Sequence, residues 1–356
     1  MTQDTLPPAV SSAAVPSTAV PGADGSGSPG TLTEPPPLRC ADAARMRGEP
    51  LHASAARYSR FLLLEVPGPW GKSALDGKHM DADVAQPLAH AAKAAGTHVV
   101  LIRRPGRHPS VRAGTANRSM AWAFADTSPE AERVLWGSWR DPADLLDLDL
   151  NAAIPGPASA AGPQRLALVC TNGKRDQCCA IRGRPVAAAI AAATDWDTWE
   201  CSHLGGHRFA ATAMLLPTGD MFGWLDPESA LEVVQRFDLG QVMLSHYRGR
   251  SGQSAPAQAA LHAAAVRLGD FRRGALRVSS AHPVPAAGPG SGRPANPADE
   301  AELWEIEVIH QTELSPGIAY RVLIAGSKLA PTFLSCSDGT RKSEVRFEAH
   351  SFSRIE

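Results

Sequence analysis

Hydrophobic and polar positions alternate along the chain in a way that predicts a large α/β block and a short β block. In the first part, apolar runs at residues 61–66 and 98–103 predict two strands. The Ala-rich stretch at 81–95 between them predicts a helix. A β–α–β unit of this length is typical of a small α/β lobe.

The second part of the block gives a clearer series of elements. An apolar run at 166–169 predicts a strand that ends at Cys170, and Pro185 predicts the start of a helix that continues to about residue 193. The following patterns predict a strand at 198–201, a hairpin with its turn at 217–220, and a helix from Asp226 to about residue 237. The order β-α-β followed by β-β-α is that of a thioredoxin-like fold. The first lobe is a candidate for a second unit of this kind that lacks ligands.

The C-terminal block has the period-two pattern of strands. Trp304, Ile306 and Val308 alternate with Glu305 and Glu307. Residues 320–325 and 344–352 show the same alternation, and the block is therefore predicted to be a small antiparallel β appendage.

Segments rich in Pro, Ala, Gly and Ser separate the predicted domains. Such segments bury too little apolar surface to fold and serve as tails or linkers. No internal sequence repeat is evident. The predicted organisation is a disordered tail at 1–38, an α/β lobe at 39–155, a thioredoxin-like domain at 156–280, a linker at 281–300 and a β block at 301–356.

Charge and composition exclude several classes of protein. The 356 residues include 35 Lys and Arg and 36 Asp and Glu, a net charge of −1, which argues against binding of nucleic acid or acidic membranes through bulk charge. No apolar run approaches the roughly 20 residues that span a bilayer, and the N-terminus lacks the pattern of a secretory signal. We expect a soluble cytoplasmic protein. Six cysteines are too few for a disulfide scaffold.

Four of these cysteines and two histidines fall within 38 residues, in CTNGKRDQCC at 170–179 and CSHLGGH at 201–207. Thiolates and imidazoles suit zinc or an iron–sulfur cluster. Eight residues separate Cys170 from Cys179, a long loop for zinc but a comfortable one for a wider cluster. Two thiolates and two imidazoles also match the ligand count of a histidine-containing [2Fe–2S] centre.

The glycine pair between His203 and His207 predicts a tight loop after a strand, in which the backbone approaches a cofactor and both rings turn inward. No Glu lies between these histidines, which excludes the HExxH arrangement of zinc proteases.

The remaining cysteines have simpler interpretations. Cys178 is interpreted as a thiol that faces away from the ligands, Cys201 as a core residue, and Cys40 and Cys336 as structural or incidental. The basic residues near the ligands form either a solvated face or a docking surface for an acidic partner; they are Lys174, Arg175, Arg182, Arg184 and Arg208.

The runs CTNGKRDQCCAIRGRP and WECSHLGGHRFAA, together with RGEPL at 47–51 and EVPGPWGKSAL at 65–75, resemble the sucrase/ferredoxin-like family. The resemblance covers roughly residues 40–252. It implies a thioredoxin-like ferredoxin domain with a [2Fe–2S] cluster held by Cys170, Cys179, His203 and His207, with Cys178 as the alternative to Cys179.

A cluster of this kind predicts an electron carrier rather than a self-contained enzyme. Two neutral imidazoles in place of thiolates favour the reduced state, so we expect a potential above the about −400 mV of plant-type ferredoxins. Solvent-facing ring nitrogens would couple this potential to pH. No GxGxxG follows a predicted strand, so the expected partners are a separate redox protein, such as a flavin reductase, and an unidentified acceptor. Two alternatives stay open: a thiol-redox protein that uses Cys178 and Cys179 or Cys170, and a structural zinc module for partner binding.

Overall fold

The structure is a computed structural model that describes residues 38–76, 80–106, 119–129, 131–152, 156, 162–285, 302–312 and 315–356. The predicted tail at 1–38, except its last residue, and most of the predicted linker at 281–300 lie outside these residues.

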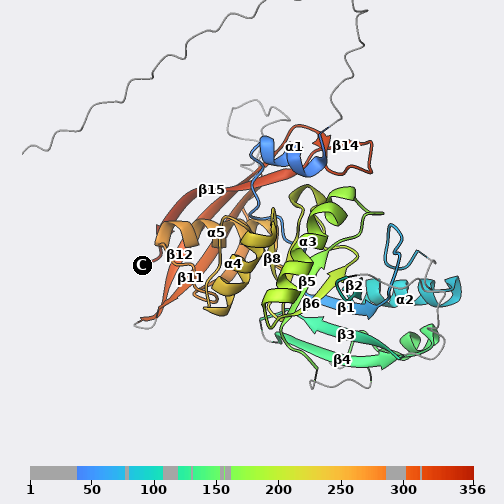
Figure 1. Ribbon diagram of the computed structural model, residues 1–356. Helices are drawn as coiled ribbons and strands as arrows, with labels where there is room; N and C mark the ends of the chain where they lie inside the picture. The colour runs from blue at the N-terminus through green and yellow to red at the C-terminus, as the bar shows by residue number, and fades with distance from the viewer. Residues whose placement is uncertain are drawn as a thin grey trace, which may run out of the picture. The chain divides into compact units, whose positions relative to one another are not determined.

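Nine strands of the described part form one large mixed sheet (Figure 1). In spatial order they are β4 (Arg133–Trp139), β3 (Met120–Asp126), β1 (Arg60–Glu65), β2 (Thr97–Arg103), β6 (Asp197–Cys201), β5 (Leu166–Cys170), β7 (Ala213–Leu216), β8 (Asp220–Phe222) and β9 (Tyr247–Arg250). The strands predicted at 61–66, 98–103, 166–169 and 198–201 are confirmed.

The sheet repeats one topology in its two halves. β1 and β2 are parallel and joined through helix α2 (Ala82–Ala94), and β5 and β6 are parallel and joined through helix α3 (Gln177–Ala193). In each half, two further antiparallel strands continue the sheet outward, β3 and β4 in the first and β7 and β8 in the second. The halves join where β2 pairs antiparallel with β6, through Ile102 with Cys201 and Arg103 with Glu200. The first lobe is therefore continuous, through one sheet, with the half that contains the predicted ligands.

Alternating side chains of the strands divide between separate apolar cores. Phe61 and Leu63 of β1 and Leu168 and Cys170 of β5 belong to one core that both halves share. The intervening side chains pack beneath helices: those of β1 contact α2 and the 3-10 helix η1 (Pro142–Asp147), and those of β5 contact α3 and α4 (Pro227–Asp238). Both apolar runs read in the sequence are thus strands buried on two faces.

Helix α3 corrects the predicted local structure. It begins at Gln177, not at Pro185, because the Asp176 side chain caps it by accepting a hydrogen bond from the Cys178 N–H at 2.9 Å. Pro185 lies inside the helix. The polar loop predicted to reach Cys179 therefore ends at Asp176, and both neighbouring cysteines lie in the first helical turn. The helix predicted after Asp226 is confirmed as α4, with a capping box at its start.

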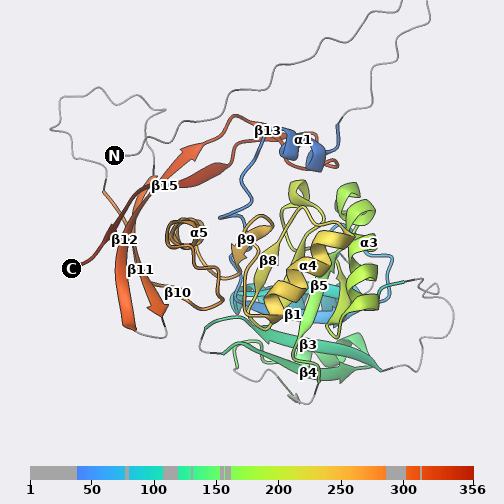
Figure 2. The same ribbon diagram turned by 60° about the vertical axis from the view of Figure 1, so that its left-hand side comes forward.

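The C-terminal part forms a separate antiparallel sheet in the order β10 (Leu276–Pro283), β11 (Glu302–Thr312), β12 (Ser315–Lys328) and β15 (Val345–Arg354). β10 extends three residues into the predicted linker, where 281–283 pair with β11. Helix α5 (Ala255–Leu268) packs its alanines against the apolar face of this sheet (Figure 2). A hairpin of β13 (Thr332–Phe333) and β14 (Arg341–Lys342) lies beside helix α1 (Cys40–Met46) (Figures 1 and 2).

Candidate metal centre

The carboxyl ends of β5 and β6 bring two cysteines side by side. Cys170 and Cys201 are register partners in the parallel pair, and both are fully buried. Parallel strands end at the same edge of a sheet, which is where chemistry gathers in α/β proteins. The backbone of Cys170 also packs closely against α3, because Gly183 lets that helix approach until a Cβ there would lie 2.1 Å from the Cys170 carbonyl oxygen.

Cys179 completes a group of buried thiols with Cys170 and Cys201. Hydrogen bonds from Cys179 and then Cys201, together with the imidazole of His203, lower the pKa of the Cys170 thiol against the opposing effect of burial. The same hydrogen bond to Cys170, together with burial, raises the pKa of Cys179. Cys170 is accordingly the more acidic thiol of the pair, and the Cys179 thiol donates to it.

The two histidines follow β6 in a tight loop, as the glycine pair predicts. Gly205 and Gly206 have φ of +77° and +73°, and a 3-10 turn, η2 (His207–Phe209), follows them. The rings of His203 and His207 stack with centroids 4.9 Å apart. The Nδ1 atom of His207 lies 4.0 Å from the Sγ of Cys179.

These two imidazoles are half-buried and available as ligands. Burial, and then the charge of His203, lowers the pKa of His207 to about 4, so its ring is neutral at pH 7. The Nδ1 atom of His203 is buried without a hydrogen-bond partner among the described residues. An unpaired buried nitrogen is the state expected of a ligand atom. The structure therefore brings Cys170, Cys179, His203 and His207 together at one edge of the sheet; we call them the Cys–His set.

The spacing of the Cys–His set bears on the kind of metal that it could hold. One tetrahedral zinc ion requires its ligand atoms to be about 3.3–3.8 Å apart, from bonds of about 2.0–2.3 Å. In the described part of the chain, no three ligand atoms of the Cys–His set lie within 4.8 Å of one another. A two-iron cluster distributes its protein ligands over two metals, so the donor types and their spread fit that group.

A scan against family models matches residues 51–249, more than half of the chain, to a family described as sucrase/ferredoxin-like. The chain belongs to the sucrase/ferredoxin-like family. Searches of curated proteins and of solved structures gave no match. None of the helices in the described ranges has the length and apolar character needed to cross a bilayer.

The sucrase/ferredoxin-like region also contains a buried arginine that the sequence reasoning missed. Arg248 of β9 is 2 % exposed and supports the loop of His203 and His207 from behind. Its guanidinium donates to the Gly205 carbonyl at 3.1 Å, to the Ser54 hydroxyl at 3.0 Å and to the Ser54 carbonyl. Burial lowers the pKa of Arg248 to about 9, partly offset by Cys170 and Cys179, so it remains a cation at pH 7. No local pattern could reveal it, because Arg248 and Gly205 are 43 positions apart in the sequence.

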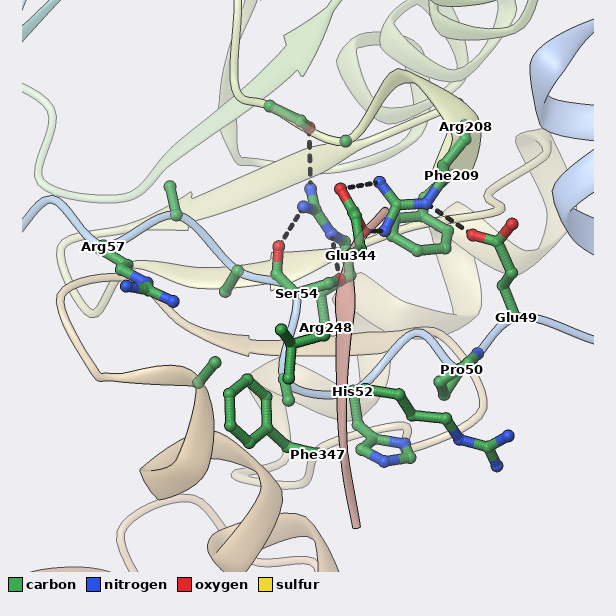
Figure 3. A pocket seen from close by; sticks show the side chains of 18 of the residues that line it. Glu49, Pro50, His52, Ser54, Arg57, Arg208, Phe209, Arg248, Glu344 and Phe347 are labelled. Atoms are coloured by element: carbon green, nitrogen blue, oxygen red, sulfur yellow. Dashed lines mark hydrogen bonds and ion pairs between the residues drawn. The ribbon is translucent and has the colours of Figure 1, made fainter. Parts of the chain in front are cut away.

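A cavity of about 520 Å³ opens beside the same loop. Figure 3 shows Arg208 on its wall between Glu49 and Glu344. Arg208 is 9 % exposed; it donates to Glu49 at 2.6 Å and to both carboxylate oxygens of Glu344. The alternatives for the basic residues were a solvated face or a docking surface, but Arg208 is instead a buried ion-pair partner that ties the family region to segments on either side of it.

The structure also groups the cysteines that were interpreted as incidental. The Cys178 thiol points away from the Cys–His set and lies 3.6 Å from Cys40 and 3.5 Å from Cys336. With Asp176, these residues form a group whose ligand atoms all lie within 4.8 Å of one another, a possible metal site. Cys40 and Cys336 lie outside the residues that match the family. We call Cys40, Cys178 and Cys336, together with Asp176, the three-cysteine group.

Proposed function

We propose that this chain is a one-electron carrier whose second half is a thioredoxin-like domain that holds a [2Fe–2S] cluster through Cys170, Cys179, His203 and His207. The observation that carries the proposal is that two buried thiols lie beside two half-buried imidazoles, one with an unpaired Nδ1. Membership of the sucrase/ferredoxin-like family supports it. The order β5, α3, β6, β7, β8 and α4 supports the thioredoxin-like assignment.

When bound, such a cluster supplies one-electron chemistry, at a higher potential than an all-cysteine cluster because neutral imidazoles replace thiolates. The protein's own residues prepare the site for it. Burial keeps His207 neutral, with a lone pair free to coordinate. Arg248 lies close enough to Cys170 and Cys179 for the charges to interact, which stabilises their thiolate forms.

Proton coupling is a second part of the proposal. Both imidazoles are half-buried, and the cavity reaches Gly205 and Gly206 between them. A ring nitrogen that is not a ligand can therefore exchange its proton with solvent, and we expect the potential to fall as pH rises. A potential that stays constant from about pH 6 to 10 would contradict this coupling.

We infer that the carrier works between two partners. In the described ranges of the chain, no dinucleotide-binding GxGxxG follows a strand. We therefore assign hydride chemistry to a separate donor such as a flavin reductase. An unidentified acceptor takes the electron.

The test uses anaerobically purified full-length chain, its visible spectrum, and assays of iron and sulfide. We expect brown protein with about two iron and two sulfide per chain. Cys170→Ser should lose the colour, whereas Cys201→Ser, the equally buried register partner, should keep it. His203→Cys and His207→Cys should keep a cluster and lower its potential.

Colourless protein after reconstitution with iron and sulfide would refute the proposal. Equal loss of colour in Cys170→Ser and Cys201→Ser would refute the ligand assignment, as would unchanged potentials in both histidine variants.

A further inference from the structure

The three-cysteine group unites parts of the chain that are far apart in sequence. Cys40 lies in α1, Cys178 in the first turn of α3, and Cys336 in the loop of the β13–β14 hairpin. The Cys178 Sγ lies 3.6 Å from the Cys40 Sγ and 3.5 Å from the Cys336 Sγ. The Cys40 Sγ also lies 3.6 Å from an oxygen of Asp176. Local packing of one segment does not explain why three thiols meet at one carboxylate.

Asp176 is a fully buried carboxylate at the centre of this group. One oxygen accepts the Cys178 N–H at 2.9 Å, and the other accepts the Cys336 N–H and the Ser335 hydroxyl, each at 2.8 Å. Among the described residues, no Lys, Arg or His forms an ion pair with it. Buried charges in proteins are paired or bind metals, so this carboxylate points to a cation.

The thiols have the support that metal-bound thiolates have. The Cys40 N–H donates to the Cys336 Sγ at 3.2 Å. Cys178 lies in the first turn of the 17-residue α3, where the helix dipole favours negative charge. Sulfur atoms 3.5–3.6 Å apart are close to the about 3.8 Å edge of a tetrahedron with zinc–sulfur bonds of about 2.3 Å. Thiolates select soft or borderline cations, and zinc accepts a carboxylate as well.

We propose that Cys40, Asp176, Cys178 and Cys336 bind one zinc ion. Coordination breaks the S–H bonds of those thiols that are still protonated and releases their protons to solvent. Three Zn–S bonds and one Zn–O bond form, and no electrons are transferred. This site shares no residue with the Cys–His set and does not rest on the proposed function.

The proposed ion fastens α1 and the β13–β14 hairpin onto α3. Figures 1 and 2 both place α1 beside the β13–β14 hairpin, and Cys40, Ala41 and Cys178 pack with Ala210, which follows the turn of His207. A cross-link between segments 138 and 158 residues apart removes much freedom from the unfolded chain. The zinc ion would hold α1 in place against η2.

The test measures zinc and iron on the same samples of full-length chain and of Cys336→Ser and Cys40→Ser. Cys336 is exposed, so its replacement leaves the apolar cores intact. Ser337→Ala, an exposed neighbour on the same loop, is the matched control. We expect about one zinc per chain in the parent and the control, at least roughly tenfold less in both cysteine variants, and unchanged iron in Cys336→Ser.

Cobalt(II) added to the chelator-treated protein gives an independent readout, because thiolate ligands produce intense charge-transfer absorption. We expect that absorption in the parent and in Ser337→Ala, and its loss in Cys336→Ser. A parent protein that retains no zinc and shows no cobalt absorption would overturn the proposal. Equal zinc content in all variants, or a Cys178–Cys336 disulfide in anaerobically purified protein, would overturn it as well. Iron content reports separately on the Cys–His set.

Discussion

Replacing Gly206 by alanine tests how Arg248 supports the histidine loop. Gly205 and Gly206 both have positive φ, so alanine is strained at either position. Their surroundings differ: a Cβ on Gly206 would lie 2.5 Å from an Nη atom of Arg248 and 2.9 Å from its Cζ, whereas a Cβ on Gly205 would meet nothing within 4 Å. Gly205→Ala is therefore a matched control for backbone strain.

The expected magnitude follows from these contacts. Left-handed backbone costs an alanine about 1 kcal/mol at either position. At Gly206 the buried guanidinium must also move, although it donates to Ser54 and to the Gly205 carbonyl. Loss of one charged hydrogen bond costs about 2 kcal/mol. We expect Gly205→Ala to lower the free energy of unfolding by about 1 kcal/mol and Gly206→Ala by about 3 kcal/mol.

Urea unfolding of both variants and the parent, at one metal loading, measures this difference. A gap of about 2 kcal/mol is roughly a 30-fold difference in the unfolding equilibrium constant. Iron content should fall more in Gly206→Ala, because displacement of Arg248 also moves the loop that carries both histidines. Equal destabilisation by the two alanines would refute the role given to Arg248.

Three further predictions concern the elements around the site. Gly183→Ala should destabilise the protein by about 3 kcal/mol or more, because its Cβ would lie 2.1 Å from the Cys170 carbonyl; an unchanged melting temperature would contradict this. Arg103→Met should lower the free energy of unfolding by about 3–5 kcal/mol, since it leaves the buried Glu200 without its ion-pair partner at 2.7 Å. The double variant Arg103→Met with Glu200→Gln should lose less; additive losses of the two substitutions in denaturant unfolding would contradict this. Burial, with the charge of a neighbouring histidine, lowers the pKa of His98 from 6.5 to about 4. The folded state therefore binds fewer protons than the unfolded state, and the free energy of unfolding falls as pH drops from about 6.5 to 4. His98→Gln should reduce that fall by about 2 kcal/mol at pH 4.5, and an equal fall in the variant and the parent would refute this.

The elements that the sequence predicts correctly have local signals. The strand at Leu166–Cys170 is an uninterrupted apolar run, and the helix after Asp226 has its capping residue beside a proline. α3 shows how two local signals can compete. Pro185 is a common first-turn residue, yet Asp176 caps the helix eight residues earlier than predicted and the helix accommodates the proline.

The early start of α3 changes the chemistry of the adjacent cysteines. Successive residues on a helix point about 100° apart, so Cys178 and Cys179 serve different surroundings. Cys179 lies in the core shared with Cys170, and Cys178 faces Cys40. A loop would have left the choice between these two thiols open.

Long-range pairing is what the sequence could not predict. The two halves of the sheet are joined by two residue pairs between β2 and β6. Neither strand has a local sequence pattern that identifies the strand with which it pairs. The three-cysteine group is a more extreme case, because Cys40 and Cys336 are 296 residues apart. Isolated cysteines carry no spacing that could identify them as ligands.

The repeated topology explains why only one half carries the predicted ligands. In the first half, the parallel pair ends with Glu65 opposite Ile102, whereas in the second it ends with Cys170 opposite Cys201. The same scaffold thus presents two equivalent edges, and the residues at the strand ends make only one of them a candidate site. Because Ile102 itself pairs with Cys201, the first half has become part of the wall that keeps these thiols away from water.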